Sequence, residues 1–323
     1  MTALWIILGV TAGIIFLVFL ASFICFYMAF FTSRKAPKNA PEFDIPPGHI
    51  YEPHREQMIK WMKEARSMTC RECEITSFDG LTLHGKFYEF KKGAPIELMM
   101  HGYRGSAERD LCGGIQRCFS LGRSCLIIDQ RGCGKSEGHV ITFGINERKD
   151  CLKWVGYILE NIDPEAKIIL CGISMGASTA LMASAEKLPD NVVGVLADCG
   201  FSSAKAIIKK VIHQMKLPEN LLYPFVRLGA KIYGGFDLEE TSATEALEKT
   251  SLPVIFYHGE ADDFVPCNMS VENYNVLKSD KQLVTMPNAG HGLCYLVDPD
   301  TYLETLSKFS REHYKIECEI QNK

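Results

Sequence analysis

The segment Gly172-Ile173-Ser174-Met175-Gly176 follows a short apolar run and precedes a run of small residues with a helical pattern. Glycines two residues before and after a serine fit a sharp turn from a buried strand into a helix, because a Cβ at either glycine would collide with neighbouring backbone. Such a turn holds the serine hydroxyl clear of the sheet, at the positive end of a helix. The pattern therefore requires a strand, a tight turn and a helix in that order, and it makes Ser174 a candidate nucleophile.

The surrounding sequence alternates between strand and helix signals. Asp79-Gly80 lies between alternating runs at residues 74–78 and 81–90, which predicts a hairpin with a two-residue turn. Short apolar strands between helices are buried on both faces of a sheet. The expected fold class is α/β, a mostly parallel sheet flanked by helices and preceded by an antiparallel hairpin. Further strands are expected at residues 96–100, 124–128, 167–171, 192–197, 253–257 and 281–285, and helices at 107–120, 147–161, 177–187 and 298–313.

The N-terminal part of the chain is strongly apolar. Residues 3–31 carry no charged side chain and are rich in Ile, Leu, Val and Phe. A helix of about 20 apolar residues crosses the hydrocarbon core of a bilayer, so this run is long enough to span it. A cleaved signal peptide is the alternative, but nothing basic precedes the run. We therefore expect a single-pass transmembrane anchor over residues 1–32.

Charges and cysteines bear on the side of the membrane. Arg34, Lys35 and Lys38 follow the apolar run, and the positive-inside rule then places the catalytic domain in the cytoplasm. The chain has 13 cysteines, and a reducing compartment would keep such scattered thiols unpaired. A glycosylation sequon at Asn268 favours the opposite side in a eukaryotic cell. The expectation is a cytoplasmic catalytic domain.

After the anchor, we expect a linker segment and then a catalytic domain. Residues 33–69 form a proline-rich linker and a juxtamembrane helix at residues 54–67, and residues 70–323 form the catalytic domain. Within that domain, residues 202–251 form an insertion with a mostly helical pattern, expected to be a lid over the carboxyl edge of the sheet. One stripe of the juxtamembrane helix favours packing on the catalytic domain over lying on the membrane; it comprises Met58, Trp61, Met62 and Ala65.

Composition excludes one class of function. The formal net charge is −4 and the pI is about 6.2, with basic and acidic residues interspersed. Nucleic-acid binders normally carry a basic face, so a nucleic-acid partner is not expected.

A serine hydroxyl needs a base, and the base needs a group that orients it. In an architecture of this kind the acid and the histidine follow later strands than the serine does. Asp262 follows the strand at residues 253–257, and His291 follows the next strand. Both lie at carboxyl ends of strands, where sites on open α/β sheets form. The sequence therefore predicts a triad of Ser174, Asp262 and His291, with Asp263 as the rival for the acid.

The developing oxyanion needs two hydrogen-bond donors. The backbone amide of Met175, directly after the nucleophile, is one, and that of Tyr103, in the loop after the third strand, is the other. No metal and no organic cofactor are needed for this chemistry. His101 and His258 each precede a glycine at a strand end and are expected to bind loop backbone without transferring protons.

These motifs together resemble those of the α/β-hydrolase superfamily. The resemblance covers about residues 70 to 315 and is to the bacterial membrane-anchored serine hydrolases grouped with the Bem46-like and serine aminopeptidase-like branches. It implies the α/β-hydrolase fold with a small helical lid and the triad above, while this fold hosts many substrates. The residues that carry it are His101-Gly102-Tyr103-Arg104-Gly105, the glycines and serine of residues 129–138, Gly172-Ile173-Ser174-Met175-Gly176, Asp198-Cys199-Gly200-Phe201, Gly259 with Asp262 and Val265-Pro266, and Gly290-His291-Gly292.

The expected activity is hydrolysis of a carboxylic ester through an acyl-enzyme, with a small-molecule or lipid-derived acyl substrate. A serine peptidase or aminopeptidase is the alternative, and an aminopeptidase would need a carboxylate such as Glu239, Glu240 or Glu245 beside the site. A non-catalytic membrane scaffold with a hydrolase fold is a third reading. Apolar lid residues fit simple packing better than a substrate site; they are Ile207, Ile208, Val211, Ile212, Leu221, Leu222 and Phe225.

Overall fold

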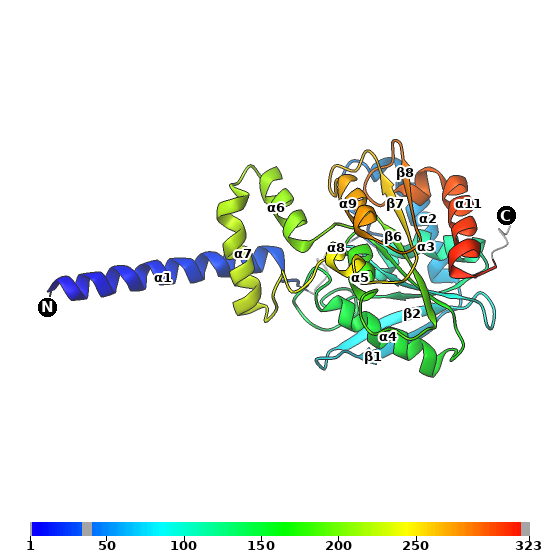
Figure 1. Cartoon of the computed structure of the whole chain (residues 1–323), viewed down its shortest axis with the longest axis horizontal. Helices are drawn as coiled ribbons and strands as arrows, with labels where there is room; N and C mark the ends of the chain where they lie inside the picture. Colours follow the sequence, from blue (N-terminus) through cyan, green and yellow to red (C-terminus); the bar gives the residue numbers. More distant parts are fainter. Residues whose placement is uncertain (1, 34–40, 318–323) are drawn as a thin grey trace.

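The computed structural model describes residues 2–33 and 41–317, and an eight-stranded sheet lies at the centre of this part of the chain (Figure 1). The strands are β1 (Arg71–Thr76), β2 (Thr82–Tyr88), β3 (Ile96–Met100), β4 (Ser124–Ile128), β5 (Ile168–Ile173), β6 (Val192–Asp198), β7 (Val254–Gly259) and β8 (Lys281–Met286). Their order is β1-β2-β4-β3-β5-β6-β7-β8. β2 pairs antiparallel with β1 and β4, and all other neighbours are parallel. The predicted fold class is confirmed.

Helices cover both faces of the sheet. They are α1 (Thr2–Ala29), α2 (Arg55–Ser67), α3 (Ala107–Ser120), α4 (Glu147–Asn161), α5 (Met175–Ala183), α6 (Ala204–Gln214), α7 (Glu219–Tyr233), α8 (Ala243–Leu247), α9 (Asn268–Val276), α10 (Cys294–Val297) and α11 (Pro299–Phe309), with a 3₁₀ turn at Glu52–His54 and a π turn at Ser310–Tyr314. Successive residues of β3 point to opposite faces. Leu98 packs with α4, α5 and α8 in one buried cluster, and Met99 packs with α2, α3 and α11 in another.

The hairpin before the parallel strands differs from the prediction. Thr76 pairs with Thr82, and the amide of Ser77 donates to the carbonyl of Leu81 at 2.8 Å. The turn therefore has three residues, and the prediction of a two-residue turn was wrong. Gly80 has φ +92°, a conformation that suits glycine and closes this longer loop.

The segment expected as a linker is part of the catalytic body where it is described. Ile45 and Tyr51 are buried and pack with Met58, Met62 and Leu293. The helix α2 packs against α3, as its apolar stripe predicted. Within the segment predicted to be a linker, the chain therefore packs on the surface of the domain. Residues 34–40, with the basic side chains used to predict orientation (Arg34, Lys35 and Lys38), lie outside the described residues.

The insertion at residues 202–251 has two parts. Helices α6 and α7 form a hairpin of helices away from the sheet (Figure 1). The helix α8 instead packs against α5, with Ala243 and Leu247 in the core beside the sheet. Of the predicted lid, α6 and α7 are the part that lies away from the sheet, and the name lid is used for these two helices below.

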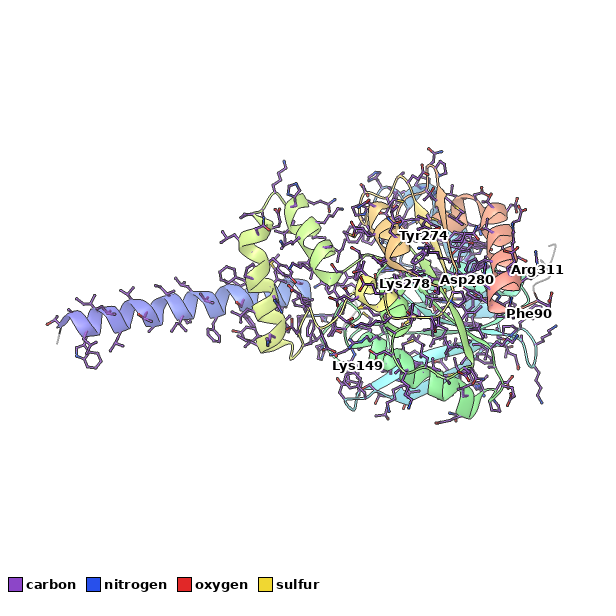
Figure 2. The ribbon with its side chains drawn as sticks, viewed as in Figure 1. Phe90, Lys149, Tyr274, Lys278, Asp280 and Arg311 are labelled. Carbon is purple, nitrogen blue, oxygen red and sulfur yellow. The ribbon has the colours of Figure 1, made fainter. Side chains whose placement is uncertain are left out.

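The helix α1 is long and apolar enough to cross a membrane by length and composition, and it is the one such helix in the described part of the chain. Its N-terminal half projects from the rest of the molecule (Figures 1 and 2), and residues 2–17 are exposed. Contact with the lid begins towards its C-terminal end, where Ser22 and Phe26 are buried. A Cβ on Gly229 of α7 would lie 2.3 Å from the Ser22 carbonyl oxygen. The backbones of α1 and α7 therefore approach each other so closely that position 229 has no room for a side chain.

The C-terminal end of α1 is bonded to the loop that follows β3. The Tyr103 hydroxyl donates to the Ala29 carbonyl at 2.8 Å, and the Arg104 guanidinium donates to the carbonyls of Met28 at 2.8 Å and Phe31 at 3.0 Å. The last carbonyls of a helix have no intrahelical partner, and a cation is favourable at that end. The loop after β3 therefore caps α1 and fixes it to the catalytic body.

The α1–α7 contact predicts the effect of a larger residue at Gly229. We expect Gly229→Leu to lower the free energy of unfolding by about 1–3 kcal/mol, because overpacking forces the two helices apart. Denaturant unfolding of the full chain in detergent measures it. Gly13→Leu is the control, since Gly13 is also on a helix and a Cβ there has open space around it. Equal stability of the two variants would contradict the close α1–α7 packing.

Candidate active site

Ser174 lies in the turn between β5 and α5, with φ 56° and ψ −119°. This positive φ is strained for a residue with a side chain, and the packing around it holds it in place. A Cβ on Gly172 would lie 2.1 Å from the Gly176 carbonyl carbon, and one on Gly176 would lie 2.0 Å from the Met100 carbonyl oxygen. The two glycines thus let the turn approach the end of β3, as the sequence pattern predicted.

The structure brings the three residues of the predicted triad together. His291 Nε2 lies 2.8 Å from Ser174 Oγ, and His291 Nδ1 lies 2.7 Å from Asp262 Oδ2. The side chains come from the loops after β5, β7 and β8, whose carboxyl ends meet at one edge of the sheet. The rival acid, Asp263, is exposed, and none of the described hydrogen bonds joins its side chain to His291.

The Asp262 carboxylate is held on both oxygens. Oδ1 accepts from the amides of Phe264 at 3.0 Å and Val265 at 2.8 Å, and Oδ2 lies 3.3 Å from His258 Nε2. Burial alone would raise the pKa of Asp262, but hydrogen bonds from His258 and His291 outweigh burial and lower this pKa to about 2. The carboxylate is therefore ionised at neutral pH. Its contribution to stability is present above the pKa of an unfolded aspartate and is lost as the pH falls through about 2.

Two further histidines bind loop backbone, as predicted. His258 Nε2 lies 2.8 Å from the Val265 carbonyl oxygen, and its Nδ1 lies 2.7 Å from Ser270 Oγ. His101 Nδ1 lies 2.7 Å from the Gly102 carbonyl, while the Gln130 amide donates to His101 Nε2 at 3.0 Å. The first histidine supports the loop that carries Asp262, and the second shapes the loop after β3.

The oxyanion donors stay a prediction, and the residues named for them, Met175 and Tyr103, lie in segments that adjoin Ser174. Met175 is the first residue of α5, where a helix amide has no intrahelical acceptor. Tyr103 follows Gly102, and a Cβ on Gly102 would lie 3.5 Å from the Ser174 Cβ. The Gly102 amide donates to Asp110 at 3.1 Å, so this loop is fixed beside the serine.

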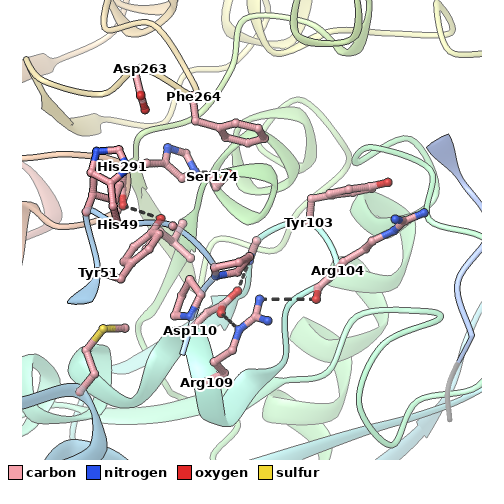
Figure 3. A pocket seen from close by; sticks show the side chains of 18 residues that line it. His49, Tyr51, Tyr103, Arg104, Arg109, Asp110, Ser174, Asp263, Phe264 and His291 are labelled. Atoms are coloured by element: carbon pink, nitrogen blue, oxygen red, sulfur yellow. Dashed lines mark hydrogen bonds and ion pairs between the residues drawn. The ribbon is translucent and has the colours of Figure 1, made fainter. Parts of the chain in front are cut away.

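Ser174 lies where two cavities meet. The first has a volume of about 470 Å³ and is lined by charged and polar side chains, among them Arg109, Asp110 and His291 (Figure 3), together with apolar ones such as Ile50 and Met58. Arg109 Nε donates to Asp110 at 2.7 Å, so these two charges are paired. The second cavity has a volume of about 290 Å³, and its lining is almost wholly apolar. A bound molecule at Ser174 thus has a polar side and an apolar side.

The segment before α2 forms part of the first cavity, which sequence reasoning missed. Residues 46–51 line this cavity, and the Tyr51 hydroxyl donates to the His291 carbonyl at 3.0 Å. Proline and glycine dominate this stretch, and neither gives a periodic signal. The pairing with His291 spans almost the whole domain in sequence, so no local pattern indicates it.

The carboxylates considered for binding a substrate amine lie elsewhere. Glu239 is paired with Arg227 at 3.3 Å, and Glu240 with Arg148 at 2.6 Å. Neither of them lines the two cavities around Ser174, and neither does Glu245. None of the three glutamates considered from the sequence is therefore placed to hold a substrate amine beside Ser174.

One grouping of potential metal ligands occurs in the described residues. Cys199, Asp262 and His291 offer ligand atoms within 4.8 Å of one another. Burial raises the pKa of the Cys199 thiol well above its ordinary value, so the thiol stays protonated and is a poor ligand. Asp262 and His291 are already bonded to each other. The donor set suits a hydrogen-bonded triad better than a metal.

The comparisons with known proteins agree with one another on the family. The family described as alpha/beta hydrolase fold matches residues 98–244. The chain is 29% identical to the uncharacterised protein YqkD of Bacillus subtilis over 59% of this chain and 63% of YqkD, which is less than two thirds of that protein. It is 27% identical to Bem46 of Schizosaccharomyces pombe over 76% of this chain and 78% of Bem46. The Pyrococcus furiosus esterase Pf2001 has a similar fold, with a TM-score of 0.63 and 22% identity over 84% of this chain and 97% of that one.

The Tyr51–His291 hydrogen bond predicts a stability change. We expect Tyr51→Phe to lower the free energy of unfolding by about 1 kcal/mol, because the buried His291 carbonyl loses its partner. Denaturant unfolding measures it. The control is Tyr274→Phe, which removes a partly buried hydroxyl that makes no hydrogen bond among the described residues. An equal loss in both variants would show that the hydroxyl of Tyr51 does not secure the histidine loop.

Proposed function

Because this chain belongs to the α/β-hydrolase superfamily, we propose that it is a serine hydrolase that cleaves carboxylic esters through an acyl-enzyme. The fold alone hosts many chemistries, so the proposal depends on the site. The observation that carries it is the unbroken line of hydrogen bonds from Asp262 through His291 to Ser174, at 2.7 Å and 2.8 Å. In this proposal Ser174 is the nucleophile, His291 the general base and Asp262 the group that orients it.

Acylation begins when Ser174 Oγ attacks the acyl carbonyl carbon and its proton moves to His291 Nε2. The carbonyl oxygen becomes an oxyanion, which the amides of Tyr103 and Met175 stabilise. Asp262 stabilises the imidazolium because it is ionised and 2.7 Å from Nδ1. The bond to the alcohol oxygen then breaks, and His291 gives its proton to the leaving alcohol.

Deacylation repeats these steps with water. His291 takes a proton from a water molecule, whose oxygen attacks the acyl carbon of the Ser174 ester. The same two amides stabilise the second oxyanion. When the intermediate collapses, Ser174 Oγ leaves with the proton from His291, and the free carboxylic acid is released. The ester and one water molecule are the reactants that balance the two steps.

Charge in the polar cavity favours an ester over an N-terminal peptide. An aminopeptidase needs an unpaired carboxylate to hold the substrate amine. Of the two carboxylates that line this cavity, Asp110 is already paired with Arg109 and with the Gly102 amide, and Asp263 is exposed. The opposing apolar cavity fits the acyl half of an ester. A non-catalytic scaffold has no need of a strained serine bonded to a buried histidine.

We further propose that α1 is retained as a membrane anchor. Ser22, Phe26 and Phe30 are buried against the lid and the catalytic body, so cleavage of a signal peptide would remove part of the packed interior. The described cysteines are all free thiols, which fits a catalytic domain in the cytoplasm. Asn268 is exposed, whereas Ser270 of its sequon is buried against His258.

Labelling by a fluorophosphonate probe tests the nucleophile. We expect the full chain in detergent to be labelled and Ser174→Ala to lose labelling completely, because the probe phosphonylates an activated serine oxygen. Ser67→Ala is the control, since Ser67 lies at the end of α2, away from the cavities. Labelling that survives in Ser174→Ala, or a folded wild type that is never labelled, would refute the proposal.

Substitution of Asp262 and of Asp263 tests which of these two adjacent aspartates is the acid of the triad. We expect Asp262→Asn to lower kcat for p-nitrophenyl butyrate by about 10⁴-fold, because the amide cannot hold the imidazole in the required tautomer. Asp263→Asn should cost less than about tenfold, since its side chain is not bonded to His291. Steady-state kinetics on both variants measures this, and a larger loss in Asp263→Asn would reverse the assignment.

A further inference from the structure

The apolar cavity beside Ser174 has walls from three parts of the chain. The last turns of α1 supply Cys25, Met28 and Ala29. The loops of the catalytic body supply Tyr103 and Phe264, among others, and α6 and α7 form the rest. The helix that spans the membrane in our proposal is therefore also a wall of the cavity that contains the nucleophile.

The chemistry of the two cavities divides the substrate into two halves. The cavity between α1 and the lid is lined almost wholly by apolar groups, whereas the cavity on the other side of Ser174 contains Arg109, Asp110 and His49. The bond that is attacked lies at their junction. An acyl chain fits the apolar cavity and a polar alcohol fits the other, so the substrate that fits both is an amphiphile.

The mouth of the apolar cavity is apolar as well. Met28 of α1 is 57% exposed, and Met215 and Leu217, in the turn between α6 and α7, are 51% and 42% exposed. All three line the cavity. Large apolar side chains exposed together around an opening are typical of a surface that contacts lipid or another apolar partner.

The position of this mouth along α1 places it near the membrane surface. Residues 2–17 of α1 are exposed throughout, and contact with the lid begins only after them. A span of about 20 residues crosses the hydrocarbon core, so a bilayer around the projecting part of α1 ends close to Ser22, where α7 crosses α1. Cys25 and Met28 follow within the next two turns. In Figure 1, α6 and α7 lie between the projecting part of α1 and the sheet.

We propose that the end of α1 and the lid together form an acyl-binding chamber that receives a long-chain acyl ester directly from the bilayer. The inference rests on the proposed esterase function and adds its substrate class. The acyl chain enters past Met28 and Met215, its carbonyl carbon reaches Ser174, and the polar alcohol remains in the cavity lined by Arg109 and His49. In this arrangement α1 determines substrate choice in addition to attaching the enzyme.

A chain-length series tests the chamber. For p-nitrophenyl acetate, butyrate, hexanoate and octanoate, we expect kcat/KM of the full chain to rise by about two- to fourfold for each added CH₂, because each methylene leaves water for an apolar wall. Cys25→Trp should fill the chamber from the α1 side. Its kcat/KM for octanoate should fall by at least about 30-fold while that for acetate stays within about threefold, since only the longer chain needs the space.

Two further variants supply a control and a second, independent way to fill the chamber. Ile24→Trp places the same side chain one residue earlier, at a position that is 49% exposed and does not line the cavity. It should leave both esters unchanged. Val211→Trp fills the chamber from α6 and should reproduce the chain-length selectivity of Cys25→Trp. If Ile24→Trp behaves like Cys25→Trp, or if both chamber variants lose acetate and octanoate activity equally, the chamber is wrong.

Vesicles test the route of entry. The full chain is reconstituted in phosphatidylcholine vesicles with a fluorogenic long-chain acyl ester, present either in the same vesicles or only in separate ones. We expect hydrolysis to be at least about tenfold faster in the same vesicles, because transfer of a long acyl chain through water is slow. Equal rates would overturn entry from the bilayer. A flat chain-length profile with intact fluorophosphonate labelling of Ser174 would overturn the chamber alone, whereas loss of labelling would overturn the hydrolase proposal itself.

Discussion

The close approach of the α5 N-terminus to the ends of β3 and β5 is the contact on which the rest of the site depends. Only glycine at positions 172 and 176 lets this backbone reach the Met100 carbonyl. The contact forces Ser174 into a strained conformation, and the surrounding sheet maintains that conformation. Because β3, β5, β7 and β8 are parallel or linked through parallel neighbours, their carboxyl ends share one edge. The loops with Tyr103, Asp262 and His291 therefore converge on a serine whose place is already fixed.

The loop after β3 connects this site to α1. Its Gly102 lies beside Ser174, while its Tyr103 hydroxyl and the Arg104 guanidinium donate to carbonyls at the end of α1. A displacement of α1 would break these bonds and disturb a predicted oxyanion donor. Directly after α1, the Phe30 carbonyl accepts from the Ile141 amide at 2.9 Å. The helix end is thus held by two loops of the catalytic body as well as by the lid, as a structural part of the domain.

Local sequence patterns predicted most of the fold and the geometry of the triad. Most of the parallel strands are short and mainly apolar runs, and the turn at Ser174 needs two glycines at a fixed spacing, so each is visible within a few residues. The roles of Tyr51 and of the α1 end were not visible. Tyr51 acts on His291 across 240 residues, and Cys25 and Met28 look like any other apolar residues of a membrane span. Contacts between distant segments leave no local period in the sequence.

The charge distribution around Ser174 explains why an apolar chamber and a polar cavity can share one nucleophile. The ionised Asp262 is surrounded by donors from Phe264, Val265 and His291, so its charge is compensated inside the protein and does not require water from either cavity. Arg109 and Asp110 compensate each other in the polar cavity. Neither side of the site therefore presents an unpaired buried charge to the acyl chain. Burying a long apolar chain beside Ser174 therefore costs no desolvation of the Asp262 carboxylate.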